Sequence, residues 1–393
     1  MLYFVAMKSY LTHLECPRCN KTFDADVLTN LCDCGSPLFP RYDLKEVAQF
    51  VSREDFGYRV HSLWRFRELL PVRSLQNVVT LFEGFTPLIS TDRIGSEIGV
   101  PKLVLKDESL NPTGSFKARG LSVAISRAKE LGVKEVCLPT AGNAGGAAAA
   151  YAAKAGMKCH VFMPRDTPKT FVEECSVLGA DLRLVDGTIA DAGRAMQPEK
   201  NEKKWFDLST LKEPYRVEGK KTMMYEIAQN LGWDLPDVIV FPTGGGTGIV
   251  GAWKAFKELK ELSWLNKAKV PRLIAVQAAG CAPIVGAWEK GQESAEEWKN
   301  ARTSAWGLRV PKAVADFLIL QAIRESGGVA IAVSEEEIAD AVRQVGAKEG
   351  MFIAPEAAAG IAAIRELRKR SLVGSEETVI LINTGCGIKY FSA

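Results

Sequence analysis

The most informative segment of the chain is Val238-Ile239-Val240-Phe241-Pro242-Thr243-Gly244-Gly245-Gly246-Thr247-Gly248. Its first four residues predict a buried strand, and the amphipathic run over residues 249–262 predicts the helix that follows. Four glycines in five residues let the backbone approach a ligand closely, and a helix N-terminus offers free N–H groups. We therefore predict that this turn binds a phosphate group. The alternative is a tight turn whose glycines only supply positive φ angles.

The same turn partly matches a pattern for dinucleotides. Gly246-Thr247-Gly248-Ile249-Val250-Gly251 has the spacing G-x-G-x-x-G, which requires an acidic residue at the end of the next strand. That strand ends Val276-Gln277-Ala278-Ala279, without a carboxylate, and no run fits the nucleotide loop G-x-x-x-x-G-K-[ST]. Because neither pattern is complete, the sequence argues against a nucleotide as the ligand whose phosphate this turn binds.

Short β-branched runs alternate with helical patterns along most of the chain. Strands are predicted at residues 103–105, 135–138, 160–163, 182–185, 238–241, 273–276 and 379–382, and helices at residues 122–131, 144–155, 222–231 and 335–348. This alternation predicts the α/β class, with two doubly wound domains and mostly parallel sheets. The predicted domains are a cysteine-bearing extension (1–45), a large α/β domain (46–110 and 225–393) and a small one (111–224).

A second turn, Asn111-Pro112-Thr113-Gly114-Ser115-Phe116-Lys117, has the composition of a loop that opens a helix. A helix capped by Ser115 would place Lys117 in its first turn. A cation is disfavoured at the positive end of a helix, so the pKa of Lys117 is predicted to fall. A lowered pKa suits an amine that acts as a nucleophile or forms a Schiff base. The alternative is an ordinary solvated lysine.

A third turn, Thr140-Ala141-Gly142-Asn143-Ala144-Gly145-Gly146, precedes a helix rich in alanine and glycine. Its free N–H groups could bind a carboxylate or phenolate, and the Asn143 amide could bond a ring oxygen. The alternative is a plain N-capping loop. A phosphate cradle, a candidate imine lysine and a second anion-binding helix start are together the parts that a pyridoxal phosphate enzyme needs.

Six segments, in order, resemble the fold-type II pyridoxal phosphate enzymes and, within them, the threonine synthase family. They are Ser115-Phe116-Lys117-Ala118-Arg119-Gly120, Gly142-Asn143, the glycine-rich turn, and residues 184–192, 214–222 and 383–389. The resemblance covers nearly the whole chain. It implies the fold-type II fold, with pyridoxal 5'-phosphate in the cleft between two α/β domains, and a homodimer.

The resemblance also implies a role for each matching residue. Lys117 would carry the cofactor as a Schiff base and act as general base and acid. Asn143 would bond the 3-oxygen of the cofactor, and Thr384 would place a neutral hydroxyl at its pyridine nitrogen. The residues implied for the cofactor phosphate are Gly244, Gly245, Gly246, Thr247 and Gly248. Those implied for the substrate are Thr140 at its carboxylate, and Ser115, Arg216 and Lys221 as candidates for its phosphate.

The implied enzyme is a carbon–oxygen lyase that acts on a phosphate ester, converting O-phospho-L-homoserine and water to L-threonine and phosphate. Alternatives stay open because Ala118 and Ala144 replace an Asp and a Thr common in the family, and because the glycine loop lacks an Asn found in many members. They are a threonine or serine dehydratase, or a related elimination or replacement enzyme such as a phosphoserine-using synthase. An alternative of another class is a silent scaffold that binds a partner protein.

Four of the nine cysteines crowd the N-terminus as Cys16-Pro17-Arg18-Cys19 and Cys32-Asp33-Cys34. Two clustered pairs resemble a zinc ribbon, and four thiolates would make a structural site without an open position. The second pair has one spacer residue where two are usual, so a vacant knuckle and a redox-labile pair stay as alternatives. The other five cysteines are scattered and predicted to be buried thiols.

The composition excludes several classes of protein. With 47% hydrophobic and 25% charged residues among 393, the chain can bury a large core. A net charge of +3 and the lack of a basic cluster argue against a nucleic-acid partner. The apolar start, residues 1–7, is too short for a signal peptide, and no run predicts a membrane span. We therefore expect a cytoplasmic enzyme with a small amino-acid substrate.

Overall fold

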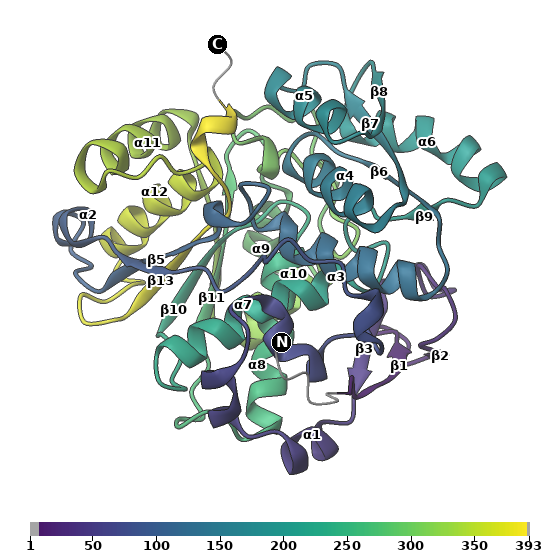
Figure 1. Cartoon of the computed structure of the whole chain (residues 1–393). Helices are drawn as coiled ribbons and strands as arrows, with labels where there is room; N and C mark the ends of the chain where they lie inside the picture. The colour runs from purple at the N-terminus through teal and green to yellow at the C-terminus, as the bar shows by residue number, and fades with distance from the viewer. Residues whose placement is uncertain (1–7, 391–393) are drawn as a thin grey trace.

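The computed structural model describes residues 8–390, so the apolar start at residues 1–7 lies outside the described chain. Two lobes, each built on its own sheet, lie side by side, and a small N-terminal sheet lies below the smaller lobe (Figure 1). The strands of the larger sheet belong to residues 88–107 and 238–383, and those of the smaller one to residues 135–207. Both sets lie within the predicted domains, whose boundaries themselves stay a prediction.

The larger sheet has six strands in the order β12-β11-β10-β13-β5-β4. All neighbours in it are parallel except β4 and β5. The strands are β4 (Leu88–Ser90), β5 (Leu103–Asp107), β10 (Val238–Pro242), β11 (Arg272–Ala278), β12 (Val329–Val333) and β13 (Val379–Asn383). The strand order changes direction between β10 and β13, which makes the end of β10 a switch point where ligands bind in such sheets.

The smaller sheet has four parallel strands in the order β8-β7-β6-β9. They are β6 (Glu135–Pro139), β7 (Lys158–Pro164), β8 (Asp181–Val185) and β9 (Phe206–Asp207). Here the order changes direction beside β6, so the end of β6 is the switch point of this lobe. The predicted α/β class with mostly parallel sheets is confirmed, and every predicted strand is a strand of the structure.

Helices cover the faces of both sheets (Figure 1). They are α1 (Leu44–Phe50), α2 (Asp92–Glu97), α3 (Lys117–Glu130), α4 (Asn143–Ala155), α5 (Lys169–Val177), α6 (Ile189–Lys203), α7 (Arg216–Asn230), α8 (Thr247–Glu261), α9 (Pro283–Glu289), α10 (Asp316–Glu325), α11 (Glu335–Glu349) and α12 (Pro355–Lys369). Helix α7 begins six residues before its predicted start. The reason is Glu213, whose carboxylate accepts hydrogen bonds from the backbone N–H groups of Tyr215 and Arg216.

The N-terminal segment forms an antiparallel sheet that the sequence did not predict. Its strands are β1 (Leu11–Glu15), β2 (Thr22–Asp24) and β3 (Phe39–Tyr42), in the order β2-β1-β3. Strands this short carry little periodicity. Arg127 of α3 joins the segment to the core by donating to the carbonyl of Ala25 and the carboxylate of Asp26.

Between residues 8 and 390, no helix is both long and apolar enough to cross a membrane.

Candidate active site

A cavity of about 700 Å³ lies at the ends of β6 and β10, the two switch points, and both lobes contribute to its wall. All three predicted turns reach it. The predicted residues that line it are Lys117, Thr140, Asn143, Gly244, Gly245, Gly246, Thr247, Gly248 and Thr384. Turns far apart in the sequence meet because each follows the carboxyl end of a strand that is central in its sheet.

Lys117 is the first residue of α3 and opens into this cavity. Burial, with the charge of Arg216 as a second cause, lowers the pKa of Lys117 to about 8. The predicted direction of the shift agrees, although the sequence argument rested on the helix dipole. Ser115 is not the cap of α3. Its hydroxyl accepts from the N–H of Lys117 at 3.4 Å, and Phe116 is the capping residue.

The lowered pKa of Lys117 predicts a pH dependence of stability in the cofactor-free protein. Between pH 8 and 10.5 the unfolded chain holds this proton and the folded chain does not, so stability rises with pH. The gain should approach about 3 kcal/mol over that interval. Urea unfolding at pH 7 and pH 10.5, of wild type and Lys117→Met, measures it. The free energy of unfolding of wild type minus that of Lys117→Met should rise by that amount from pH 7 to pH 10.5, and parallel profiles would contradict the shift.

The glycine-rich turn joins β10 to α8 and lines the cavity. No side chain of the described residues caps the N-terminus of α8, so its first N–H groups lack helical partners. Gly246 has φ +84°, and a Cβ there would lie 2.3 Å from Ile319. A Cβ on Gly244 would lie 2.1 Å from the carbonyl oxygen of Gly307. These glycines are therefore required by neighbouring protein atoms as well as by room for a ligand.

Helix α4 begins at Asn143 with an equally open N-terminus, since no side chain in the described chain caps it. Thr140 lies just before it, with its hydroxyl accepting from the N–H of Gly142 at 3.2 Å. The amide nitrogen of Asn143 donates to the hydroxyl of Tyr390 at 3.1 Å. The cavity thus has two uncapped helix starts, which favour two anionic groups, and a lysine with a lowered pKa near them.

Comparison with known proteins agrees with this geometry. Residues 79–385 match the family model described as "Pyridoxal-phosphate dependent enzyme". The chain belongs to this family. It is 36% identical to the threonine synthase of Methanocaldococcus jannaschii, over 95% of this chain and 92% of that protein. It is 35% identical to the threonine synthase of Methanosarcina acetivorans, over 95% and 91% of the two chains.

Solved structures show the same fold. Maize serine racemase superposes with a TM-score of 0.67 at 24% identity, covering 77% of this chain and 88% of that one. A tomato (Solanum lycopersicum) threonine deaminase superposes with a TM-score of 0.64 at 22% identity, covering 79% and 85%. The fold is that of the fold-type II pyridoxal phosphate enzymes, as predicted.

The cavity fits the cofactor that gives the family its name. The uncapped start of α8 suits a phosphate group, and the low pKa of Lys117 suits an amine that bonds an aldehyde. The carbonyl oxygen of the Asn143 side chain is buried and has no hydrogen-bond partner among residues 8–390. A polar ligand beside Asn143 would satisfy it. Thr384 follows β13 and lines the cavity, as expected for a group that meets the cofactor ring.

Of the residues predicted to bind the substrate, only some lie at the cavity. Thr140 lines the cavity, whereas Ser115 and Arg216 lie behind its wall. Arg216 is fully buried and donates to the carbonyl of Leu208 at 2.5 Å, so it is not a surface arginine. Lys221 is unavailable to a substrate, because Glu218 at 2.6 Å and Glu258 at 3.0 Å already hold its ammonium group.

Helix α3 is held in place by a buried ion network below Lys117. The guanidinium of Arg119 meets Glu108 and Glu226 at 2.6 Å each, and Lys106 meets Glu226 at 2.8 Å. Although burial opposes it, the charges of Arg119 and Lys106 lower the pKa of Glu226 to about 2. The network stays ionised and fixes the helix that presents Lys117.

Several cavity residues were not predicted. Asn30 and Leu31 come from the loop between the cysteine pairs, and Asn30 donates to the carbonyls of Asp207 at 2.9 Å and Lys212 at 2.8 Å. Glu356 and Tyr390 come from the large lobe. Five cationic side chains also line the cavity, and within the described chain all but Lys212 form ion pairs with carboxylates: Arg194, Lys200, Lys212, Arg309 and Lys312. No local pattern marks these residues, because only the packing of distant segments brings them to the cavity.

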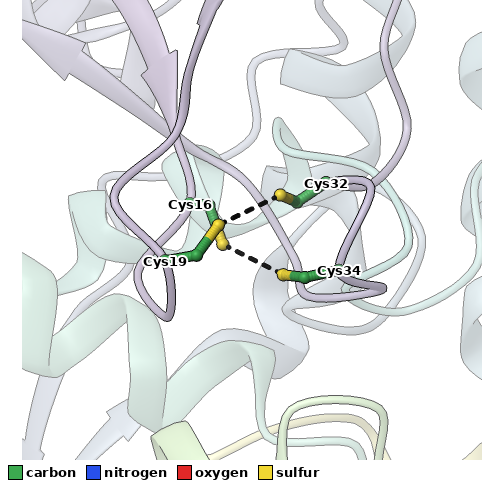
Figure 2. A group of neighbouring side chains, drawn as sticks. All are labelled: Cys16, Cys19, Cys32 and Cys34. Carbon is green, nitrogen blue, oxygen red and sulfur yellow. Dashed lines mark hydrogen bonds between the residues drawn. The ribbon is translucent and has the colours of Figure 1, made fainter.

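The four N-terminal cysteines converge (Figure 2). Their sulfur atoms all lie within 4.8 Å of one another, with 3.5 Å from Cys16 to Cys34 and from Cys19 to Cys32. The short spacer in the second pair is accommodated by Gly35, whose φ of +79° closes a tight turn after Cys34. Four thiols at this spacing fit a tetrahedral zinc ion.

Proposed function

We propose that this protein is a threonine synthase, which converts O-phospho-L-homoserine and water to L-threonine and phosphate. The observation that carries the proposal is its 36% identity to a threonine synthase over 95% of the chain, with Lys117, Asn143 and the glycine-rich turn in one cavity. The uncapped start of α4 and the side chains of Lys117 and Lys212 in that cavity support an anionic substrate.

Each proposed step is performed by residues of the cavity. The N–H groups at the start of α8 hold the cofactor phosphate, and Thr140 with the N–H groups at the start of α4 binds the substrate carboxylate. When bound, pyridoxal phosphate supplies the electron sink that lets a proton leave the carbon beside the amino group. Lys117 takes and returns protons at Cα and Cβ, because its pKa of about 8 lets it carry or release one near neutral pH.

Arg216 is proposed as the group that attracts the substrate phosphate. Its Nε atom is buried without a hydrogen-bond partner within residues 8–390, and its charge acts on Lys117. Burial raises the pKa of the neighbouring Glu213 to about 7, so that carboxylate neutralises Arg216 only in part. A buried cation beside the cavity that Glu213 and Asp207 compensate only in part favours a strongly anionic ligand.

One assay tests the proposal against its rivals. Purified protein with pyridoxal phosphate is given O-phospho-L-homoserine, and phosphate and threonine are measured, with L-threonine, L-serine and O-phosphoserine tested separately. We expect equal amounts of phosphate and threonine from the first substrate. Ammonia and 2-oxobutyrate from threonine, without turnover of O-phosphohomoserine, would instead identify a dehydratase.

We also propose that the four N-terminal cysteines (Figure 2) hold a structural zinc ion. Cys16→Ser should then remove the metal and lower the melting temperature by several degrees, because the segment loses its internal anchor. The chemical step should stay intact, and any change in activity should appear in KM, because Asn30 and Leu31 of the same loop line the cavity. Metal analysis and thermal unfolding measure both effects.

The matched control for Cys16→Ser is Cys159→Ser, which changes a buried cysteine outside the cluster. It should lose stability by burying a hydroxyl but keep the metal content. Wild-type protein without bound metal would refute the zinc site. Loss of the chemical step in folded Cys16→Ser would show that the cluster does more than stabilise the chain.

A homodimer and a cytoplasmic location complete the proposal. The large apolar side chains of Tyr58, Phe82 and Leu110 are exposed, and a partner subunit would cover them. All nine cysteines are free thiols, which supports a reducing compartment. Sedimentation of the purified protein tests the dimer, and a monomer at micromolar concentration would refute it.

A further inference from the structure

A chain of three hydrogen bonds joins the two lobes across the cavity. The side-chain N–H of Asn143, in the small lobe, donates to the hydroxyl oxygen of Tyr390 at 3.1 Å. The Tyr390 hydroxyl donates to Glu356 at 2.7 Å, and the backbone N–H of Gly307 donates to the same carboxylate oxygen at 2.6 Å. Asn143, Gly307, Glu356 and Tyr390 all line the cavity that holds Lys117.

The direction of each bond follows from the carboxylate. The Glu356 oxygen that accepts from the N–H of Gly307 also accepts from Tyr390, so the single proton of the Tyr390 hydroxyl is committed to it. The Tyr390 oxygen must then accept its second bond, and Asn143 can supply that bond only with its NH₂ group. The chain therefore determines which end of the Asn143 amide points to Tyr390, and so which atoms remain for a ligand. The remaining atoms are one N–H and the unpartnered Oδ1.

The packing keeps this chain in place. Glu356 lies in the first turn of α12 and is 4% exposed. The ring of Phe171, in the small lobe, meets the Tyr390 ring edge to face at 5.4 Å between centroids. The adjacent Lys389 is held by Glu174 at 2.7 Å and by the carbonyl of Thr113 at 3.0 Å. Tyr390 is thus anchored on both sides.

We propose that Tyr390 and Glu356 are positioning residues for Asn143, which orient its amide so that an N–H faces the ring oxygen of the bound cofactor. This inference rests on the proposed function, which puts pyridoxal phosphate in the cavity. Burial raises the pKa of Tyr390 well above its usual value, which keeps the hydroxyl protonated and able to donate. Tyr390 acts through Asn143, and Glu356 acts through the same chain and also through its charge on Lys117.

The test measures cofactor binding in Tyr390→Phe and Glu356→Leu. Tyr390→Phe removes the acceptor for Asn143. Glu356→Leu removes the acceptor of the Tyr390 hydroxyl, which can then donate to Oδ1 of a flipped Asn143. Glu356→Gln is the conservative variant, because its Oε1 can still accept from both Gly307 and Tyr390 while the charge is lost. We expect Tyr390→Phe and Glu356→Leu to bind pyridoxal phosphate about 5- to 50-fold more weakly than wild type, the effect of a lost or misdirected hydrogen bond. The absorption maximum of the bound cofactor should shift, because the ring oxygen loses its donor.

The matched control is Tyr151→Phe. Tyr151 lies on the same helix as Asn143, and its buried hydroxyl also donates to a glutamate, Glu83, at 2.7 Å. This control should lower the melting temperature while cofactor affinity and absorption stay as in wild type. Because Tyr390 and Glu356 act through one chain, the loss of affinity in their double variant should resemble that of either single variant.

The outcomes separate the inference from the function on which it rests. Wild-type protein that fails to bind pyridoxal phosphate overturns both. Wild type that binds it, with Tyr390→Phe matching it in affinity and spectrum, overturns only the positioning role. Additive losses in the double variant also overturn that role. If Tyr390→Phe does not fold, the comparison of Glu356→Leu with Glu356→Gln decides by the same two readouts.

Discussion

Replacing Lys117 by alanine is expected to abolish turnover, reducing kcat by at least about a thousandfold, because the residue is the proposed base and acid at two carbons. The variant should still fold, since the ion network of Arg119 holds α3 independently of the lysine side chain. It should also bind pyridoxal phosphate more weakly, having lost the covalent bond. Steady-state kinetics and a cofactor titration measure both changes.

The same assignment can be checked in the unmodified chain. Borohydride treatment of wild type, digestion and mass spectrometry should find the pyridoxyl group on Lys117. The competing residue is Lys220, which is also buried and whose ammonium group lies 3.6 Å from the centre of the Phe116 ring. Burial, together with the charge of Lys117, lowers the pKa of Lys220 well below its usual value. An adduct on Lys220 would refute the assignment, and Lys154→Ala serves as a control on an exposed lysine.

Loss of Arg216 is expected to be the next largest effect and to depend on the substrate. If this guanidinium attracts the leaving phosphate, Arg216→Ala should cost about 2–4 kcal/mol of transition-state stabilisation. That corresponds to a drop of roughly 30- to 900-fold in kcat/KM for O-phosphohomoserine. Dehydration of free threonine, where it is measurable, should hardly change, because that substrate carries no phosphate.

The burial of Arg216 requires a second variant and a control. Truncation leaves a hole and Glu213 without its counter-charge, so part of any loss could come from destabilisation. Arg216→Lys keeps the charge but removes the planar fork, and should fall between wild type and alanine. Arg65→Lys changes another buried arginine, which donates to the carbonyl of Phe56. It should lower stability without altering the ratio of the two activities. Equal losses on both substrates in Arg216→Ala would mean that Arg216 is structural.

The phosphate-binding turn can be tested by substitution. A side chain at Gly246 would occupy the turn proposed to hold the cofactor phosphate. The positive φ of Gly246 and the nearby Ile319 make any side chain there costly to the fold as well. Thr247→Val is a better variant, because it keeps the shape of a cavity-lining residue and removes only its hydroxyl.

Seven strands of the two larger sheets and the three turns could be predicted from local sequence. Buried parallel strands appear in the sequence as continuous β-branched runs. The residues that follow such a strand form the start of a helix, whose N–H groups are either capped or left for a ligand. For this reason β10 with its glycine-rich turn, and β6 with Asn143, could be identified from neighbouring residues alone. Lys117 could be identified for the same reason. A few neighbouring residues are enough to predict that it lies at the start of a helix.

The residues that surround those turns could be identified only from the tertiary structure. Asn30, Glu356 and Tyr390 reach the cavity from three distant segments, and each is oriented by a partner that is remote in sequence. The environment of Arg216 was likewise invisible, because burial depends on the packing of whole elements rather than on adjacent residues. Polar side chains in a protein interior must find partners wherever the fold supplies them, and those partners set their orientation and charge.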